Sequence, residues 1–472
     1  MNLPKEKIKK ILIIRPDAIG DLVLITPAIS ALRKSFPQAH IAILLQAYAA
    51  PVMEFNPDIN EIIIDKIKGN EIKGIGDYLK YVAEIKARHF DLSVDFYSFH
   101  WKHTLLQFLA GIPYRLGDKS RLLLSPFYNL GKVLKYKDYT KHIVDLHLDL
   151  LKTIGIEESQ PRLKLIVPEK IQQDFAEKLK ALGINQSDFL VGVHPGCISS
   201  RAWDEDKFAK VIDGLYEQFN AKVVLTGGSK EQEKGDRISN LCQHPPINLI
   251  AKTTLPEMMA LIKRLNIYIG ADTGPTHVAG ALGTPVLLII LAKNVKPVRW
   301  ASYNSPHMII YAHPRAQCAI FCDAGSCQEV FCSQVISPAE VLAGVQYLRE
   351  GKSFQKSDWE KLSFNTLLIF DAERQTLAES ISKELKNKGY YAVLFKAEEI
   401  RGLKGIKTLL KIIETENILI LHHLGTKAYL WTRLANLLSG IYTTNATILV
   451  KGYVDKQDIL SQYNSAFQKS LF

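Results

Sequence analysis

The sequence predicts an α/β protein with two Rossmann-like halves, in which parallel strands alternate with helices. Three observations lead to this fold class. Lys10 to Phe36 shows a buried strand, a polar turn and an amphipathic helix in succession. Ile267 to Leu291 has the pattern strand, turn, helix, strand, and its turn is rich in small and polar residues. Between these stretches, short apolar runs alternate with helical segments, which is typical of a doubly wound parallel sheet.

Length and composition narrow the class of protein. A chain of 472 residues is long enough for two or three domains, each with its own core. A hydrophobic content of 47% and a charged content of 23% are ordinary for a globular protein. The formal charge of +11 favours a polyanionic substrate, an acidic membrane surface or nucleic acid without choosing among them. Because no basic block is interleaved with aromatic residues, we expect no nucleic-acid partner.

The N-terminus carries no pattern of a secretion signal. Met1 to Lys10 is polar and rich in lysine, and the apolar run Ile11 to Ile14 is too short for a signal-peptide core. No apolar stretch reaches the roughly 18 residues that a membrane-spanning helix needs. We therefore expect a cytoplasmic protein. Peripheral contact with the cytoplasmic face of the inner membrane is compatible with this sequence.

The first strand ends in a turn that carries a candidate catalytic carboxylate. Arg15 to Asp21 follows the strand Lys10 to Ile14 and leads into a helix predicted from Leu22 to Phe36. Of the GxGxxG fingerprint only Gly20 is present, which argues against a dinucleotide redox cofactor. Asp21 lies at the carboxyl end of the strand, where open α/β sheets place their chemistry. A helix cap explains an aspartate at this place equally well.

The rest of the first half supplies further strands and one basic, aromatic segment. Strands are expected at 41–45, 61–64 and 89–96, and a long helix at 141–154 leads out of the first domain towards a linker at 157–168. The segment Tyr97 to His103 suits contacts with an anionic or sugar acceptor, although a solvated surface accounts for it equally well. Its lysine, Lys102, is the candidate acceptor ligand.

In the second half, three predicted strands end in polar, glycine-rich loops. Strands at 189–193, 221–225 and 267–270 are followed by loops at 194–203, 226–229 and 271–277. A Rossmann topology brings such loops into one crevice at the carboxyl edge of the sheet. Ser199, Ser200 and Arg201 offer donors for phosphate oxygens, and Glu231 can accept hydrogen bonds from ribose hydroxyls.

The turn after the strand at 267–270 has the features of an anion site. Asp272 or Thr273 can cap the next helix, Gly274 permits close approach of a ligand, and Pro275 suits a first helical turn. His277 follows one turn later on the same side. Unpaired N–H groups at a helix start bind anions. An ordinary, well-capped strand–helix junction is the alternative.

Two further features stand outside these halves. Four cysteines cluster before residue 340, but their gaps lack two close CxxC pairs, so thiols are favoured over a structural zinc site: Cys318, Cys322, Cys327 and Cys332. Strands at 366–370, 391–395, 418–421 and 447–450 predict a small third α/β domain, faintly receiver-like. His422 and His423 stand where a receiver has its phosphorylated aspartate. We therefore expect an accessory domain that docks an unknown protein partner.

Several motifs together resemble one known family. The runs Asp272 to Ala279 and Ala281 to Pro285 resemble the signature of the ADP-heptose:lipopolysaccharide heptosyltransferases, the family-nine glycosyltransferases. Ile13 to Ala28 is similar to the first strand and helix of that family. Further matches are His194-Pro195-Gly196, Trp203, Gly227-Gly228, Glu231 and Ser337 to Val341. The resemblance extends from residue 8 to residue 348, with its motifs in the family's order.

The resemblance implies a GT-B fold, in which two Rossmann-like domains face a cleft. Residues 1–168 would form the acceptor-side domain, residues 169–350 the nucleotide-sugar domain, and residues 351–472 the accessory domain. It also implies an inverting, metal-independent transfer of heptose from ADP-heptose to a glycolipid acceptor of the lipopolysaccharide core type. No cofactor is expected besides the nucleotide-sugar substrate.

The family's roles carry over to particular residues of this chain. Asp21 matches the general base, and Arg15, Gly20 and Lys102 are expected on the acceptor side. The donor ligands would be Gly196, Ser199, Ser200, Arg201, Glu231, Asp272, Thr273, Gly274 and His277. The family usually has a lysine just before Trp203, where this chain has Arg201 two residues ahead. A different donor sugar, a sugar-nucleotide epimerase and a non-catalytic glycan-binding scaffold therefore remain as alternatives.

Overall fold

The structure is a computed structural model of the chain. It describes residues 3–97, 100–134, 141–197, 203–292, 295–303, 305–312 and 331–355, and beyond them residues 365–370, 375, 378–379, 383, 391–396, 418–424 and 449–451. No helix among these residues is both long and apolar enough to cross a membrane.

The N-terminal domain is built on a five-stranded parallel sheet. Its strands are β1 (Lys10–Ile14), β2 (His40–Leu45), β3 (Glu61–Ile64), β4 (Leu92–Asp95) and β5 (Tyr114–Gly117). They are ordered β3-β2-β1-β4-β5, so the chain leaves β1 in one direction and returns to its other side. The connecting helices are α1 (Ile19–Leu24), α2 (Thr26–Ser35), α3 (Ala50–Met53), α4 (Ile75–Lys86), α5 (Trp101–Leu109) and α6 (Ile143–Lys152), with short 3-10 turns η1 (Lys5–Lys7), η2 (Ala47–Ala49) and η3 (Ser125–Phe127).

The single helix predicted from Leu22 to Phe36 is wrong, because α1 ends at Leu24 and α2 begins at Thr26. Pro27 has no N–H to donate to the carbonyl of Val23, so a continuous helix would lose that hydrogen bond. Instead, the Thr26 hydroxyl donates to this carbonyl oxygen over 2.7 Å. The break leaves α1 as a short helix whose first turn faces the second domain.

The second domain surrounds a six-stranded parallel sheet. Its strands are β6 (Leu190–His194), β7 (Lys222–Leu225), β8 (Ile247–Asn248), β9 (Ile267–Ala271), β10 (Val286–Ile290) and β11 (His307–Tyr311), in the order β11-β10-β9-β6-β7-β8. Its helices are α7 (Glu169–Ala181), α8 (Glu205–Phe219), α9 (Gln232–Leu241), α10 (Leu255–Arg264), α11 (Gly274–Ala281), α12 (Pro297–Trp300), α13 (Phe331–Gln334) and α14 (Pro338–Arg349), with the 3-10 turn η4 (Ser229–Glu231). The strand order reverses between β6 and β9, which is the switch point where doubly wound sheets bind ligands.

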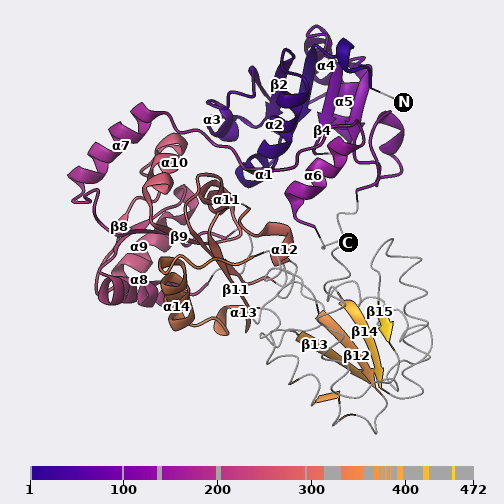
Figure 1. Cartoon of the computed structure of the whole chain (residues 1–472). Coiled ribbons are helices and arrows are strands. Elements are labelled where there is room, and N and C mark those ends of the chain that lie inside the picture. Colours follow the sequence, from indigo (N-terminus) through magenta and orange to yellow (C-terminus); the bar gives the residue numbers. More distant parts are fainter. Residues whose placement is uncertain are drawn as a thin grey trace.

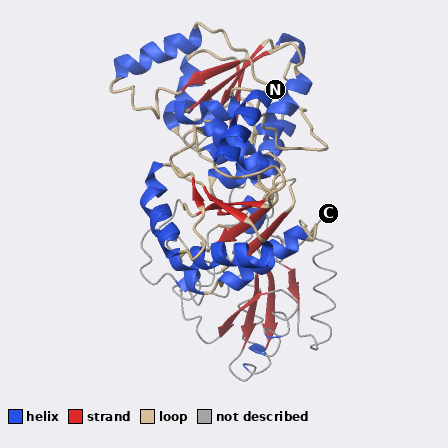
Figure 2. Ribbon diagram, turned by 90° about the vertical axis from the view of Figure 1, so that its left-hand side faces the viewer, coloured by secondary structure: helices blue, strands red, loops and turns tan. Residues whose placement is uncertain are grey.

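Both sheets are covered by helices on their two faces, which gives each domain three layers (Figure 2). Strands buried on both faces need continuous apolar runs, and Ile11 to Ile14 and Val286 to Ile290 are fully buried. In Figure 1 the two domains meet where α1 lies beside α11. The prediction of an α/β protein with two Rossmann-like halves is therefore confirmed. Between the last helix of the first half, which ends at Lys152, and α7, which begins at Glu169, the chain passes from one domain to the other.

A third set of parallel strands follows α14. These strands are β12 (Asn365–Phe370), β13 (Tyr391–Lys396), β14 (Ile418–Leu424) and β15 (Leu449–Lys451), in the order β13-β12-β14-β15. The first strand thus lies between the second and the third, as in small doubly wound proteins. β14 continues through His422 and His423, which pair with Leu368 and Ile369 of β12. The accessory role of residues 351–472 stays a prediction.

Candidate active site

The first turn of α1 carries the predicted catalytic carboxylate. The N-cap of α1 is Ala18, so Asp21 is the third residue of the helix and is not its cap. The Asp21 side chain is 24% exposed. It is therefore accessible at the edge of the sheet where β1 ends.

Arg15 fixes the position of Asp21. Arg15 is buried, and its guanidinium donates one hydrogen bond to the carbonyl oxygen of Phe96 and another to Oδ1 of Asp21. A second carboxylate, that of Asp17, lies 3.6 Å from the same guanidinium nitrogen that binds Asp21. Because the guanidinium is anchored at Phe96, the Asp21 carboxylate is held with one oxygen engaged.

Burial raises the pKa of Asp21 above its ordinary value of 3.8. The charges of Arg15 and His277 oppose this rise, and that of Asp17 adds to it. A carboxylate whose pKa is shifted towards neutrality accepts a proton more readily than an ordinary surface aspartate does. Burial at this position therefore favours the protonated form of Asp21 more than water does.

The turn between β9 and α11 holds the second group of predicted residues. Thr273 is the N-cap of α11, but its side chain makes no capping hydrogen bond. The hydroxyl of Thr276 instead donates to the carbonyl oxygen of Ala271 over 2.5 Å. The ring of His277 is buried, and its Nε2 lies 3.1 Å from Oδ1 of Asp272. This contact fixes the histidine ring at the helix start.

The first turns of α1 and α11 touch across the two domains. A Cβ atom placed on Gly20 would lie 2.9 Å from Cδ2 of His277 and 3.2 Å from Cα of Gly274. A Cβ atom on Gly274 would in turn lie 3.3 Å from the backbone nitrogen of Gly20. A side chain at Gly20 would therefore displace the His277 ring, and one at Gly274 would press on the backbone of α1. Asp21 and His277 therefore lie close enough at this contact for their charges to interact, and Asp272 lies beside the histidine ring.

A second cluster lies at the ends of β6 and β7, beside β9 in the sheet. His194 ends β6, and its Nδ1 lies 2.9 Å from the carbonyl oxygen of Thr226. A Cβ atom on Gly196 would lie 2.6 Å from Nε2 of His194 and 3.1 Å from Cγ of Glu231. The sheet thus brings Gly196 and Glu231 together, as the sequence predicts. Glu231 also accepts a hydrogen bond from the backbone of Gly228 over 2.8 Å.

Lys234 is a cation in this cluster that sequence reasoning missed. Its ammonium donates to the carbonyl oxygen of Pro195 over 2.9 Å. Burial lowers its pKa, and the charge of Glu205 opposes this shift. Lys234 follows Glu231 by three residues, so helical spacing alone puts it on the same side of the chain. That spacing is the signal that could have found it.

Lys68 lies next to Asp17, whose carboxylate also approaches the guanidinium of Arg15. Lys68 Nζ is 3.6 Å from Oδ1 of Asp17 and 4.3 Å from the centre of the Tyr97 ring. Lys102 lies on α5, with its ammonium 5.8 Å from the centre of the Trp101 ring. No sequence pattern singles out Lys68, because it stands in the irregular segment between β3 and α4.

Some predicted residues lie outside the described part of the chain. These are Ser199, Ser200 and Arg201 of the donor loop and Cys318, Cys322 and Cys327 of the cysteine cluster. The fourth cysteine, Cys332, is buried in the core of the second domain. Among the described residues, no group of His, Cys, Asp and Glu has the arrangement of a metal site.

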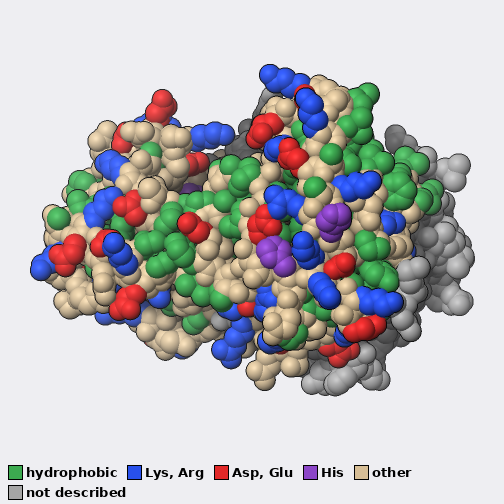
Figure 3. Space-filling model, turned by 90° about the horizontal axis from the view of Figure 1, so that it is seen from above, with side chains coloured by type: hydrophobic (Ala, Val, Ile, Leu, Met, Phe, Trp, Pro, Cys, Tyr) green, Lys and Arg blue, Asp and Glu red, His purple; other side chains and the backbone are tan. Residues whose placement is uncertain are grey.

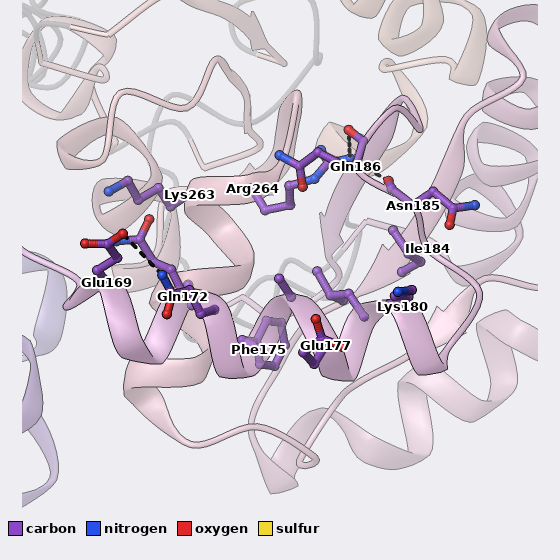
Figure 4. A pocket seen from close by; sticks show the side chains of 14 residues that line it. Glu169, Gln172, Phe175, Glu177, Lys180, Ile184, Asn185, Gln186, Lys263 and Arg264 are labelled. Atoms are coloured by element: carbon purple, nitrogen blue, oxygen red, sulfur yellow. Dashed lines mark hydrogen bonds between the residues drawn. The ribbon is translucent and has the colours of Figure 1, made fainter.

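A cavity of about 640 Å³ lies elsewhere in the second domain, between α7 and α10 (Figure 4). Its wall includes Phe175 of α7, Arg264 at the end of α10 and the turn at Asn185 and Gln186. Arg264 donates to the carbonyl oxygen of Asp188, just before β6, so the cavity is at the amino edge of the sheet. None of the predicted site residues lines it.

Comparisons with known proteins show which proteins the chain resembles. The model of glycosyltransferase family 9 (heptosyltransferase) matches residues 78–322. Lipopolysaccharide heptosyltransferase 3 of Escherichia coli K12 is 31% identical over 280 residues, which cover 57% of this chain and 78% of that protein. Another Escherichia coli protein of this name is 26% identical over 333 residues, 70% of this chain and 96% of its own length.

Solved structures show the same fold. A family 9 glycosyl transferase from Veillonella parvula superposes with a TM-score of 0.64 at 24% identity, covering 75% of this chain and 99% of that one. An Escherichia coli heptosyltransferase solved with ADP-2-deoxy-2-fluoro heptose gives a TM-score of 0.54 at 17% identity, covering 72% and 99%. The match to the family model and the relative from Escherichia coli K12 together show that the chain belongs to glycosyltransferase family 9, the heptosyltransferase family, and is a glycosyltransferase.

Proposed function

We propose that the protein transfers a heptose from ADP-heptose to a lipopolysaccharide-core-type acceptor, with inversion at the sugar carbon. The observation that carries this proposal is the meeting of two helix starts: Asp21 on α1 lies beside His277 on α11, across the domain boundary. Relatives named lipopolysaccharide heptosyltransferase, and a neighbour solved with an ADP-heptose analogue, support the choice of donor.

In the proposed reaction, Asp21 acts as the general base. The acceptor hydroxyl gives its proton to the Asp21 carboxylate while its oxygen forms a bond to the anomeric carbon. The bond from this carbon to the diphosphate oxygen breaks, and ADP leaves with the bonding electrons. A single in-line displacement inverts the anomeric centre and leaves no covalent intermediate on the protein. Arg15 holds Oδ1 of Asp21 and so leaves Oδ2 to take the proton.

The departing diphosphate would be stabilised at the start of α11. Pro275 has no N–H, and the N–H of Thr276 donates to the carbonyl oxygen of Thr273, so the backbone N–H groups of Thr273 and Gly274 would face the anion. The helix dipole also favours negative charge there. Gly274 lets the phosphate approach the backbone, and His277, whose Nε2 is held by Asp272, would donate from Nδ1 in its imidazolium form. Donors fixed in advance at the place where charge develops are an effective form of catalysis. In this proposal they neutralise the diphosphate without a metal ion.

The remaining predicted ligands complete the donor site. Glu231 would hold the ribose hydroxyls, while Gly196 allows the nucleotide to pass close to the backbone. Ser199, Ser200 and Arg201 would contact the phosphates. Lys234, which fixes the carbonyl of Pro195, would order the start of that loop.

A direct assay tests the proposal. The purified protein is incubated with ADP-heptose, or with other nucleotide sugars, together with core glycolipid and with EDTA present or absent. We expect sugar transfer from ADP-heptose alone, unaffected by EDTA. Sugar released or isomerised without acceptor would instead indicate an epimerase. Tight nucleotide binding with no transfer to any glycolipid would indicate a binding scaffold.

A further inference from the structure

The N-terminal domain exposes large apolar side chains that the proposed reaction does not use. Leu122 and Leu123 are 87% and 86% exposed, and Ile75 is 80% exposed. Leu79 and Trp101 are more than half exposed, at 53% and 55%. Isolated exposed leucines are common on soluble proteins, but several large ones on adjoining elements mark an interaction surface.

These side chains belong to α4, to α5 and to the turn before η3, which we call the exposed apolar layer. Ile75 and Leu79 are one turn apart on α4, and Trp101 begins α5. The hydroxyl of Tyr78 on α4 donates to the carbonyl oxygen of Lys102 on α5 over 2.7 Å, so the starts of these helices lie together. The rings of Phe108 on α5 and Phe127 in η3 are 5.2 Å apart, so η3 packs on α5, and the turn at Leu122 and Leu123 leads directly into η3.

The charge around this layer is predominantly positive. From Lys66 to Lys132 the sequence has eleven Lys and Arg residues and six Asp and Glu residues. Lys73 and Lys80 are exposed on either side of Ile75 and Leu79 in the sequence, and Lys132 is exposed as well. Figure 3 shows Lys and Arg side chains interspersed with hydrophobic ones on the N-terminal domain. The exposed acids here are Glu71, Asp77 and Glu84, of which Glu84 is paired with Lys66 over 2.7 Å.

The layer is also linked to the candidate active site. Lys68 lies 3.6 Å from Asp17 and 4.3 Å from the Tyr97 ring, and this ring stacks on His100 with the centres 6.3 Å apart. His100 is the N-cap of α5, immediately before Trp101. A continuous series of polar and aromatic groups therefore leads from beside Asp21 to the exposed apolar layer.

We propose that this layer is a docking surface for an anionic lipid bilayer, with five side chains as its apolar contacts: Ile75, Leu79, Trp101, Leu122 and Leu123. Apolar side chains mixed with lysines, and a tryptophan among them, suit the boundary between acyl chains and anionic headgroups. The inference rests in part on the proposed function, since a glycolipid acceptor anchored in that bilayer would reach Asp21 along the series from Trp101. A second protein chain fits less well, because protein interfaces are depleted of lysine.

Vesicle sedimentation of the full chain tests this docking surface. Vesicles of phosphatidylethanolamine with phosphatidylglycerol are compared with vesicles of phosphatidylcholine alone. The double variant Leu122→Ser, Leu123→Ser should bind the anionic vesicles at least about tenfold more weakly, because two leucines no longer enter the bilayer. The wild type should bind the neutral vesicles more weakly than the anionic ones, and added salt should weaken its binding to the anionic ones.

A matched control uses two exposed leucines of the second domain. Leu182 and Leu241 are 42% and 54% exposed, so Leu182→Ser, Leu241→Ser makes the same chemical change elsewhere. This control should bind vesicles as the wild type does. Equal binding by both double variants, or wild-type protein that stays in the supernatant, would overturn the proposal. A dimer abolished by the Leu122→Ser, Leu123→Ser change, without vesicle binding, would assign the surface to a second copy.

One further arm separates this proposal from the proposed function. A delipidated, water-soluble core oligosaccharide needs no bilayer, so the Leu122→Ser, Leu123→Ser variant should transfer heptose to it at the wild-type rate. If wild-type protein binds anionic vesicles and transfers no sugar, the proposed function fails and the docking surface stands. If it transfers to the soluble acceptor and ignores vesicles, the docking surface fails alone.

Discussion

Cδ2 of His277 lies 2.9 Å from the point where a Cβ atom of Gly20 would be, although the two residues belong to different domains. This approach brings the candidate base on α1 next to the candidate anion site on α11. A Cβ atom at position 20 would also lie 3.2 Å from Cα of Gly274, so it would press on the backbone of α11 as well as on the histidine ring.

Gly20→Ala should therefore impair transfer by separating the two helix starts. The added methyl group must displace His277 or the start of α11, and small misplacements of reacting groups are costly. We expect kcat/KM to fall on the order of tenfold or more, with little change in far-UV circular dichroism. Gly76→Ala is the control, since a Cβ atom there meets no atom within 4 Å. Equal kinetics for both variants would show that the contact is not needed.

His277→Ala should weaken the stabilisation of the leaving diphosphate. The ring is buried and held by Asp272 at 3.1 Å, so the alanine variant removes a donor fixed in place. We expect kcat to fall on the order of a hundredfold. Single-turnover kinetics and calorimetric ADP titration would separate the chemical step from nucleotide binding. Unchanged kcat together with unchanged ADP affinity would exclude His277 from the site.

Much of this site could be predicted from the sequence, because parallel strands bring their carboxyl ends to one edge. The runs ending at His194, Leu225 and Ala271 are short and apolar, and each is followed by glycine or small polar residues. Sheet order then makes them neighbours without any knowledge of side-chain packing. The strand predicted at 189–193 begins and ends one residue early.

Contacts that depend on packing across the chain could not be predicted in the same way. The sequence pattern does not show that Arg15 is buried with its guanidinium on Phe96, far along the chain. Lys68 reaches Asp17 from an irregular segment with no periodicity. The structure was also needed to exclude Asp21 as the cap of α1, because the helix begins earlier than the apolar pattern indicates and its N-cap is Ala18.

Arg15 should set the pH at which the enzyme becomes active. The positive charge of Arg15 lowers the pKa of Asp21, opposing the larger rise due to burial. Arg15→Met removes that charge, so the Asp21 pKa should rise further. Because the base must be deprotonated, the acidic limb of the kcat/KM profile should move to higher pH. Arg15→Lys should keep the limb closer to the wild-type position. A profile that does not move would show that Arg15 has only a structural role.

His142 should link the stability of the domain interface to pH. Its Nδ1 accepts a hydrogen bond from the backbone of Val144 over 3.2 Å, and its Nε2 lies 3.0 Å from the carbonyl oxygen of Ala301 in the second domain. Burial lowers the pKa of His142 from 6.5 to about 3, although its hydrogen bond to Ala301 opposes the shift. A group with a lowered pKa binds fewer protons in the folded state, so its contribution to stability is lost as pH falls below 6.5.

His142→Asn tests this link. Asparagine can still cap α6 but is too short to reach Ala301, so the variant should lose about 1 kcal/mol of stability at neutral pH. Urea unfolding should also show a shallower loss of stability between pH 6.5 and 3 than in the wild type. His147, whose pKa is likewise lowered by burial, supplies part of the slope that remains. Identical slopes in variant and wild type would contradict this assignment.

The central claim is that Asp21 takes the proton from the acceptor, and Asp21→Asn tests it most directly. The amide keeps the shape and an acceptor oxygen for Arg15, but it cannot take a proton at neutral pH. Burial raises the pKa of Asp21 in the folded state, so ionisation of this carboxyl lowers the stability of the wild type as pH rises. The Asp21→Asn variant does not ionise and should therefore melt no lower than the wild type at pH 7. In one experiment, heptose transfer and ADP affinity are measured on both proteins. We predict that transfer falls by a factor on the order of a thousand while ADP affinity is kept. Transfer by Asp21→Asn at the wild-type rate would contradict the account.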